Sequence, residues 1–382
     1  MLRSFANTFS KPLLNESNEI PVITLVSGNS SADLDSVIGS ISYSFLYYNY
    51  WENPIYPFIN ILKKDLTLRK DIQYIFDEFH LDPENFLFVD DLIRAEKKNF
   101  DLILVDHNSL QYDKKIIEVT KFNVTGIIDH HFDEKLYLNA NPRIIEKSGS
   151  CSSLILNYWY DLYLSSNSKH TNMNEVFKSI AKFILPPILI DTACMTHKVE
   201  KSDLRAIEII KNHLDSSSAL NFQNYFQEIR SRKTDISGFS IYELLKKDYK
   251  EYEYNGHKVG ISTIPDSIDY IFKQNSFGNE SKFLTDFNKW SKERQLDLCV
   301  VMTNFVDKST DKFTRELLLS FVNKSLDLSK IIDSLDKKLD LVEINNISID
   351  DNSNIVVYEQ RNIQHSRKQV APFLQEIFQN SS

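Results

Sequence analysis

Short apolar runs rich in Val, Ile and Phe recur along the first 150 residues of the chain. They occupy positions 22–26, 55–59, 86–90, 102–106, 126–130 and 143–146. Runs that are apolar at nearly every position are typical of parallel strands buried on both faces. Between positions 37 and 46, apolar residues instead recur every three or four residues, which predicts one face of a helix. Alternating strands and helices predict a doubly wound parallel sheet, an α/β fold.

The pattern predicts a second, smaller α/β domain after a polar stretch at 216–218. New apolar runs predict strands at 258–264, 298–304, 317–322 and 355–359, followed by a helix from about Lys368. A chain of 382 residues also exceeds the roughly 250–300 at which one hydrophobic core usually stops growing. We therefore expect one domain over 1–215, a linker over 216–224 and a second domain over 225–382, with the active site in the cleft between the domains.

Composition excludes several classes of protein. Acidic residues outnumber basic ones by 53 to 44, and the net charge of −9 argues against a stable nucleic-acid partner. Hydrophobic residues make up 42% of the chain, which is too many for a disordered protein. The three cysteines lie far apart, so no disulfide framework is predicted and a reducing compartment is favoured.

Two features of the sequence bear on location. The longest uninterrupted apolar run, 183–190, is far shorter than the roughly 20 residues needed to span a bilayer, so no membrane segment is expected. The first fifteen residues contain Arg3 and Lys11, no acidic residue and several Ser and Phe, a composition faintly similar to that of a mitochondrial presequence. A cytoplasmic protein is the main expectation, and mitochondrial import is the alternative.

Carboxylates and imidazoles cluster where predicted strands or helices end. The clusters lie at 29–35, 106–108, 129–131 and 191–192. Ligands of open α/β sheets bind at the carboxyl ends of the strands. Carboxylates as close in sequence as Asp33 and Asp35 repel each other in a low-dielectric cleft unless a cation lies between them. Together the clusters predict a divalent-metal site.

Each cluster taken alone has a plainer explanation. An isolated Asp-x-Asp is more often a helix cap than a ligand pair, and Asp191 is placed where it could simply end a helix. His107 alone is more often a surface imidazole, or one that lies behind the metal ligands, than a ligand itself. The triplet at 129–131 resists this explanation, because three titratable residues interrupt a run that should be a buried strand. The metal prediction therefore depends on the four clusters occurring together.

The order of these motifs resembles that of the DHH phosphoesterases, a family named for the triplet that lies here at 129–131. In that family, residues of the four motifs hold two divalent cations. The resemblance implies the following metal ligands: Asp33, Asp35, Asp106, His130 and Asp191. It also implies that Asp106 and Asp191 bridge the cations and that His131 faces the substrate phosphate, so that these three residues are the expected catalytic residues.

The C-terminal half resembles one of the two domain types that accompany a DHH domain. It contains no Gly-Gly pair, so it lacks the Gly-Gly-Gly-His motif of the enzymes that cut short oligonucleotides or cyclic dinucleotides. The sequence from Ser366 instead resembles the Ser-Arg-Lys signature of the DHHA2-type domain, a mixed-sheet unit of family II pyrophosphatases and eukaryotic exopolyphosphatases. The resemblance implies substrate binding by Lys250, Arg367 and Lys368. A solvated basic helix face is the alternative for these residues.

Position 29 distinguishes the two enzyme types. Family II pyrophosphatases have His at this position, whereas this chain has Asn29, which becomes a candidate metal ligand in its place. Loss of the imidazole leaves a shell dominated by oxygen, which favours Mg²⁺ over Mn²⁺ or Co²⁺. Asn29 resembles the yeast-type exopolyphosphatases, as do segments 148–153 and 199–203. The sequence at 106–108, Asp-His-Asn, resembles the pyrophosphatase form instead.

Small and hydroxyl residues at 148–153 precede the apolar stretch of a predicted helix. The free N–H groups at such a helix start can bind an anion, which makes Ser148 and Ser150 candidate substrate ligands. A plain helix cap explains the same residues equally well.

These observations lead to one functional hypothesis and two alternatives. The hypothesis is an exopolyphosphatase, a hydrolase that uses two divalent cations to activate water and release the terminal phosphate of linear inorganic polyphosphate. The alternatives are a family II-type inorganic pyrophosphatase and a non-catalytic phosphate-binding regulatory protein. The exopolyphosphatase likeness also favours a monomer. Because the predicted metal ligands and basic signature lie on different domains, domain closure is expected.

Overall fold

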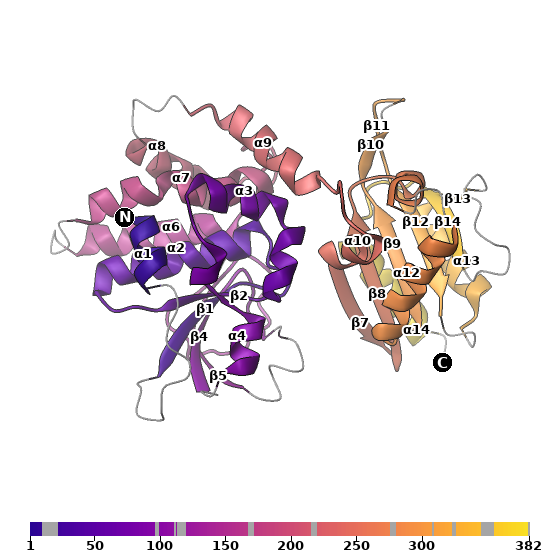
Figure 1. Cartoon of the computed structure of the whole chain (residues 1–382), viewed down its shortest axis with the longest axis horizontal. Helices are drawn as coiled ribbons and strands as arrows, with labels where there is room; N and C mark the ends of the chain where they lie inside the picture. The colour runs from indigo at the N-terminus through magenta and orange to yellow at the C-terminus, as the bar shows by residue number, and fades with distance from the viewer. Residues whose placement is uncertain are drawn as a thin grey trace. The chain divides into compact units, whose positions relative to one another are not determined.

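The computed structural model describes residues 1–9, 22–95, 99–110, 112, 120–166, 172–214, 220–275, 280–307, 309–322, 326–344 and 355–380. Its contacts separate two compact units, Met1–Asp235 and Ile236–Ser382 (Figure 1). The predicted polar stretch at 216–218 lies outside the described residues. Among the helices in these described ranges, none combines the length and apolar character needed to cross a membrane.

The first unit is built on a six-stranded parallel sheet with the order β3-β2-β1-β4-β5-β6. The strands are β1 (Ile23–Ser27), β2 (Tyr56–Ile59), β3 (Leu87–Phe88), β4 (Asn99–Val105), β5 (Lys121–Asp129) and β6 (Arg143–Ile145). Every neighbouring pair is parallel. The order reverses between β1 and β4, and ligands of doubly wound sheets bind at such a reversal. The predicted parallel fold of this unit is confirmed.

Helices of the first unit cover both faces of its sheet. They are α1 (Leu2–Phe9), α2 (Leu34–Trp51), α3 (Lys70–Glu78), α4 (Val89–Arg94), α6 (Cys151–Ser165), α7 (Met173–Asp191), α8 (Lys201–His213) and α9 (Phe222–Thr234), with 3-10 turns at Lys63–Leu68 and Pro83–Asn85. Alternate strand residues face opposite sides, so Val26 packs in the core with α2, α6 and α7, while Leu25 packs in the core with α4. Two hydrophobic cores therefore enclose the sheet.

Helix α1 is part of the larger of these cores. Leu2, Phe5 and Ala6 are buried, and the ring of Phe5 lies 5.6 Å from the rings of both Phe45 and Tyr48 on α2. Part of the segment whose composition is faintly similar to that of a mitochondrial presequence is thus a helix that packs on the folded domain.

Two predicted elements of the first unit differ from the structure. The apolar run at 86–90 forms only the two-residue strand β3 and then enters α4, because Asp91 at the third helical position accepts a hydrogen bond from the N–H of Phe88. The residues at 203–213 also predict a helix, with Ser202 or Asp203 as its N-cap. The observed helix α8 begins at Lys201 and is capped by Glu200, so Ser202 and Asp203 lie inside its first turn. In both cases a carboxylate bonded to the helix start moves the boundary.

The junction between the units lies after α9. Asp235 pairs with Lys70 on α3 at 2.9 Å, and Tyr225 of α9 donates to Glu78 of α3 at 2.6 Å. These contacts attach α9 to the first unit, and the division of contacts falls between Asp235 and Ile236 rather than across the expected linker at 216–224.

The second unit contains a six-stranded mixed sheet with the order β13-β14-β12-β9-β8-β7. The strands are β7 (Tyr249–Tyr254), β8 (His257–Ile264), β9 (Leu298–Thr303), β12 (Glu316–Phe321), β13 (Leu341–Glu343) and β14 (Ile355–Gln360), with a separate hairpin of β10 (Phe305–Asp307) and β11 (Lys312–Thr314). Only β8 and β9 pair in parallel; the other neighbours in this sheet are antiparallel. The predicted mixed sheet is confirmed, and β7 is an additional edge strand.

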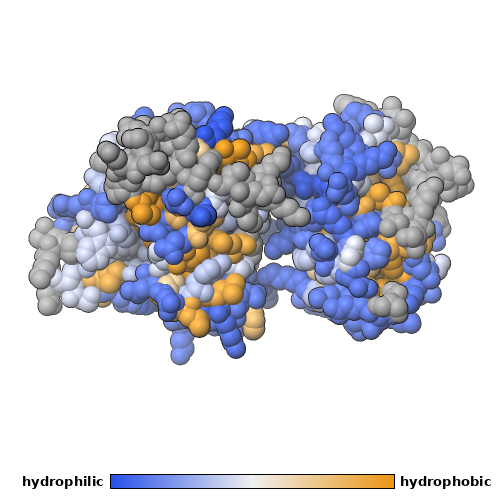
Figure 2. Space-filling view, turned by 90° about the horizontal axis from the view of Figure 1, so that it is seen from below, coloured by the Kyte–Doolittle hydropathy of each residue, from blue (hydrophilic) through white to orange (hydrophobic). Residues whose placement is uncertain are grey.

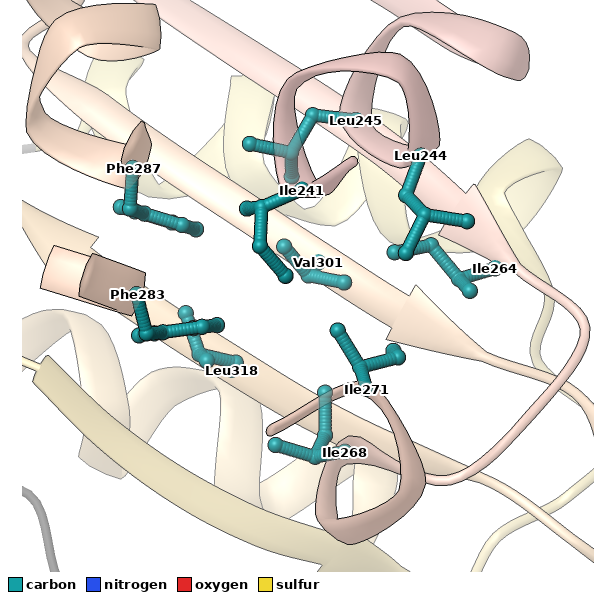
Figure 3. Close-up of a pocket in the computed structure, with 10 residues that line it drawn as sticks. All are labelled: Ile241, Leu244, Leu245, Ile264, Ile268, Ile271, Phe283, Phe287, Val301 and Leu318. Carbon is teal, nitrogen blue, oxygen red and sulfur yellow. The ribbon is translucent and has the colours of Figure 1, made fainter. Parts of the chain in front are cut away.

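Helices pack on the second sheet and leave one small cavity beneath them. They are α10 (Ile241–Lys247), α11 (Ile268–Tyr270) with a π-helical turn at Ile271–Asn275, α12 (Glu280–Glu293), α13 (Leu328–Leu339) and α14 (Arg367–Gln379). Side chains from α10, α11, α12 and three strands converge on the cavity, which has a volume of about 10 Å³ (Figure 3). Its lining is entirely aliphatic or phenyl, so the cavity offers no hydrogen bond to a water molecule.

Hydrophilic residues dominate the face of each unit seen in Figure 2, with separate hydrophobic areas between them. Isolated apolar residues on a surface are ordinary in globular proteins.

Candidate metal and phosphate site

The loop after β1 contains the first motif and leads directly into α2. Asp33 is the N-cap of α2, with its Oδ1 accepting from the N–H of Ser36 at 3.1 Å. The cap explanation considered for this residue is therefore correct, but it uses only one carboxylate oxygen. Burial raises the pKa of Asp33, yet Lys233, Ser36 and Arg69 together bring it below its ordinary value. Asp33 is thus an ionised carboxylate at the carboxyl end of β1.

Asp106 follows β4, next to β1 in the sheet, and lies at the centre of the site. It is 3% exposed and has a left-handed backbone, with φ of 63°. Its Oδ2 accepts from Asn29 Nδ2 at 2.8 Å and from Ser36 Oγ at 2.7 Å. Burial and the charge of Asp33 raise the pKa of Asp106 to about 7. Such a carboxylate is poorly compensated in the protein without a bound cation.

Asn29 is adjacent to Asp106, as its predicted role requires. Its amide N–H donates to Asp106, while its Oδ1 accepts from the N–H of Ser31 at 2.8 Å. The oxygen that a cation would use is therefore bonded to Ser31. Direct metal binding by Asn29 stays a prediction, and in this structure Asn29 orients Asp106.

Asp129 organises the triplet after β5. It is fully buried, and its Oδ1 accepts from the N–H of His130 at 2.8 Å and from Nδ1 of His131 at 2.8 Å. Asn108 donates to its other oxygen and to the carbonyl of Phe132. Burial raises the pKa of Asp129, but the hydrogen bonds from His131 and Asn108 outweigh burial and lower it. The ring of His131 is thereby fixed at Nδ1 and remains 47% exposed.

His130 turns inward from the same triplet. Its Nε2 lies 3.1 Å from Asp106 Oδ1, and its Nδ1 lies 3.0 Å from the carbonyl of Ser148. Burial lowers the pKa of His130, but the hydrogen bond to Asp106 and the charges of Asp35 and Asp191 raise it to about 10. The ring of His130 thus lies between a carboxylate oxygen of Asp106 and the carbonyl of Ser148.

Asp35 lies in the first turn of α2 and binds the start of α6. Its Oδ2 accepts from the N–H of Cys151 at 2.6 Å, and its Oδ1 accepts from Ser152 N at 2.9 Å and Ser150 Oγ at 3.0 Å. The anion at this helix start is therefore a side chain of the protein. The single hydroxyl proton of Ser148 is shared between the carbonyl of Ser150 and a carboxylate oxygen of Asp203. With these donors engaged, substrate binding by Ser148 and Ser150 stays a prediction.

Asp191 is the last residue of α7 and belongs to the same electrostatic cluster. Burial and the charge of Asp35 raise the pKa of Asp191 well above its ordinary value, while Lys233 opposes the rise. The charges of Asp33, Asp35 and Asp106 all act on Asp191, so the fourth sequence motif lies near the first two.

Two basic residues that the motifs do not contain also face the cluster. Burial lowers the pKa of Lys233, but Asp191, Asp71 and Asp33 outweigh burial and raise it. Arg69 donates to the carbonyl of Ser31 in the first-motif loop. Lys233 is on α9 and Arg69 precedes α3, so no local sequence spacing connects them with the motifs. They could not have been identified before the fold was known.

His107 does not lie at the surface, which was one of the two placements expected for it. It is buried, with Nδ1 at 2.9 Å from the carbonyl of Val105, and its Nε2 has no hydrogen-bond partner within the described ranges. Burial lowers the pKa of His107 to about 4, so the ring is neutral.

The basic residues predicted in the second unit come from two segments that lie together. Arg367, at the start of α14, donates from Nη2 to Asp248 Oδ1 at 2.6 Å and from Nη1 to the carbonyl of Asp248 at 2.8 Å. Lys250 follows two residues later on β7, and both Lys250 and Lys368 are exposed. The Arg367–Asp248 pair therefore joins the segment that contains Arg367 and Lys368 to the segment that leads to Lys250, within one unit.

The donor set of the first unit fits divalent cations. Ligand atoms of Asp106, His130 and His131 lie within 4.8 Å of one another, which is close enough for a shared ion. Burial, together with the neighbouring carboxylates Asp33 and Asp35, raises the pKa values of Asp106 and Asp191. Carboxylates with imidazole are ligands for Mg²⁺, Mn²⁺ and similar ions. The fold and the site together define a two-unit α/β protein with a cluster suited to divalent cations.

The chain belongs to the DHH family. Residues 23–188 match the family model described as "DHH family, N-terminal domain", and residues 227–377 match that of the "DHHA2 domain". The second match begins within α9, before the junction at Asp235, so the predicted domain limits stay a prediction.

Named relatives extend over nearly the whole chain. A Schizosaccharomyces pombe protein named "Putative exopolyphosphatase" is 33% identical over 371 residues, which cover 95% of this chain and 93% of that protein. "Exopolyphosphatase PRUNE1" of Rattus norvegicus is 25% identical over 95% of this chain and 76% of its own length. A solved structure described as a Methanococcus jannaschii "putative family II inorganic pyrophosphatase" shares the fold, with a TM-score of 0.59, 18% identity and coverage of 94% of this chain and 100% of that one.

Proposed function

We propose that this chain is an exopolyphosphatase, a hydrolase that removes the terminal phosphate of linear inorganic polyphosphate. The observation that carries the proposal is the convergence of four motif carboxylates and His130 at one edge of the parallel sheet. The relatives that cover 95% of this chain bear the exopolyphosphatase name, which favours this substrate among phosphoanhydrides.

In this proposal the acidic cluster holds two divalent cations. Asp33, Asp35, Asp106, His130 and Asp191 would hold these cations. Bound cations would supply Lewis acidity and lower the pKa of the attacking water. The protein's own contribution is to fix the carboxylates: Ser36 orients both Asp33 and Asp106.

His131 and the basic residues act on the phosphates. Asp129 holds Nδ1 of His131, so the exposed Nε2 is available to the attacked phosphate. Arg367, Lys250 and Lys368 bind the rest of the chain, because guanidinium and ammonium groups form strong charge-assisted hydrogen bonds with phosphate oxygens. Arg367 uses two of its donors on Asp248 and retains others for phosphate.

Magnesium is the proposed ion, with Mn²⁺ or Co²⁺ as substitutes. Asn29 contributes an amide where an imidazole would favour a transition metal, so the first metal position is rich in oxygen. The enzyme acts in this proposal as a monomer in the cytoplasm, without a nucleic-acid partner.

The proposal is tested by measuring phosphate release in the presence of Mg²⁺ from long-chain polyphosphate and, separately, from pyrophosphate. The control is Asp106→Asn, because Asn tolerates the left-handed backbone at this position. We expect rapid release from polyphosphate, little from pyrophosphate, and a loss of about 10³-fold in kcat for the variant, since it would lose a carboxylate that would hold the cations.

Other outcomes would select another function. Preference for pyrophosphate would make the chain a pyrophosphatase, in agreement with the Asp-His-Asn sequence at 106–108. Binding of both anions without phosphate release would indicate the non-catalytic regulatory role.

A further inference from the structure

One buried carboxylate outside the four motifs holds the loop between β6 and α6. Asp203, in the first turn of α8, is 0% exposed. Its oxygens accept five hydrogen bonds, from Ser153 Oγ (2.6 Å), Ser148 Oγ (3.1 Å), Ser150 N (3.3 Å), Gly149 N (2.8 Å) and Glu200 N (2.8 Å). Four of these donors belong to residues 148–153. A side chain of α8 therefore holds this loop, together with Asp35 of α2.

The same loop contacts two of the proposed metal ligands. The carbonyl of Ser148 lies 3.0 Å from Nδ1 of His130, whose Nε2 faces Asp106. The N–H groups of Cys151 and Ser152 hold Asp35 at 2.6 and 2.9 Å. A change in the path of the loop would therefore turn the imidazole and shift the carboxylate together.

Gly149 connects the loop to a third ligand. A Cβ atom at Gly149 would lie 2.6 Å from Thr192 Cγ2, 2.7 Å from the carbonyl oxygen of Lys198 and 2.9 Å from Asp203 Oδ2. These distances leave no space for a side chain. Thr192 directly follows Asp191, so the loop backbone packs against the end of α7 that bears this ligand.

We infer that Asp203 is a positioning residue of the metal site: through the loop at 148–153 it sets the placement of His130, Asp35 and Asp191 together. The inference rests on the proposed function, because it takes these residues as metal ligands. Residues that orient ligands contribute to metal affinity without touching the ion, and their loss commonly weakens affinity by 10- to 100-fold. A buried carboxylate that only stabilised α8 would leave metal affinity unchanged.

The test measures divalent-cation binding directly. Mn²⁺ is titrated calorimetrically into the full chain in the absence of phosphate, for wild type, Asp203→Asn and the control Asp161→Asn. Asp161 is an exposed residue of α6 that pairs with Arg205 on α8, so the control also removes a carboxylate between these two helices. In Asp203→Asn the amide N–H₂ can donate to the hydroxyls of Ser148 and Ser153, so the protein is expected to fold.

We expect the Mn²⁺ dissociation constant of Asp203→Asn to rise at least tenfold and that of Asp161→Asn to stay within twofold. The imidazole ¹⁵N resonances of His130, recorded without metal, should also shift in Asp203→Asn, because its Nδ1 partner moves. A folded Asp203→Asn with wild-type affinity and unchanged His130 resonances would overturn the inference. A wild type that binds no Mn²⁺ would instead overturn the proposed function on which the inference depends.

A milder variant keeps the test decisive if Asp203→Asn does not fold. Ser153→Ala removes one hydrogen bond to Asp203, and Ser165→Ala, which removes an exposed hydroxyl at the other end of α6, is its control. We expect the dissociation constant to rise at least threefold for Ser153→Ala alone. Equal affinities for these two variants would overturn the inference.

Discussion

The crowding of carboxylates around Asp106 leads to a prediction about the stability of the metal-free protein. Burial and the charge of Asp33 raise the pKa of Asp106 from 3.8 to about 7. Between these two pH values the folded state binds a proton that the unfolded chain releases, so stability falls as pH rises through this window. Since one pKa unit corresponds to about 1.4 kcal/mol, an ionised Asp106 costs up to about 4 kcal/mol above pH 7.

Asp106→Asn removes this cost while preserving the backbone. The variant retains one oxygen that can accept from Asn29 or Ser36, but it loses the charged contact with His130 at 3.1 Å. The pKa of about 7 already includes this contact, which lowers it. We therefore expect the metal-free variant to be more stable than wild type at pH 8, by up to about 4 kcal/mol, and we expect this gain to disappear by pH 4.

The assay is urea unfolding followed by circular dichroism, with EDTA, at both pH values. Asp77→Asn, at an exposed position of α3, is the control for loss of one surface charge. Added Mg²⁺ should reverse the order, because only wild type gains stability from binding the ion. If Asp106→Asn were less stable than wild type by more than 1 kcal/mol at pH 8 with EDTA, repulsion among the carboxylates would not be the dominant effect, and the reasoning would be refuted.

Three further predictions concern the second unit. In steady-state kinetics, Lys368→Ala should raise KM for long-chain polyphosphate about tenfold with little change in kcat, because a charge-assisted contact is lost. The control Lys337→Ala, at another exposed position, should leave both constants unchanged. Burial raises the pKa of Glu316 to about 7, so its ionisation destabilises the fold as pH rises from 4.5 to 7. In urea unfolding, Glu316→Gln should therefore be about 1 kcal/mol more stable than wild type at pH 8 and no more stable at pH 4. Equal gains in stability at the two pH values would contradict this prediction. Val301→Ile adds one carbon at the apolar cavity (Figure 3) and should raise the melting temperature by about 2 °C, since a buried methylene contributes about 0.8 kcal/mol. A lower melting temperature would mean that the cavity cannot accept the larger side chain.

The sequence was sufficient to predict the parallel sheet, because its strands are apolar on both faces. The runs at 22–26, 102–106 and 126–130 correspond to β1, β4 and β5 within a few residues. Strand β7 was missed, because its sequence alternates tyrosine with charged residues and it lies at the sheet edge, where little of it is buried. Boundaries were missed where side chains bond to helix starts, as at α4 and α8.

The site was predictable as far as its residues lie in local motifs. Asp106, His130 and Asp33 form one connected cluster, as their positions after strands required. Lys233 and Asp203 were not recognised as parts of the site, because each approaches the cluster from a helix distant in sequence. Neither Lys233, as a charge partner, nor Asp203, as the carboxylate that holds the loop, lies at a fixed sequence spacing from the residues it acts on. Their roles arise only when the chain has folded.

The docking of α1 determines what removal of the N-terminal segment would do. A cleavable import signal can be discarded without harm only if the mature domain does not pack against it. Here, removal of the first nine residues would uncover the rings of Phe45 and Tyr48 and leave an apolar groove along α2. Such a trimmed form would bind hydrophobic dyes and tend to aggregate. The first helix thus covers part of the core of the folded protein.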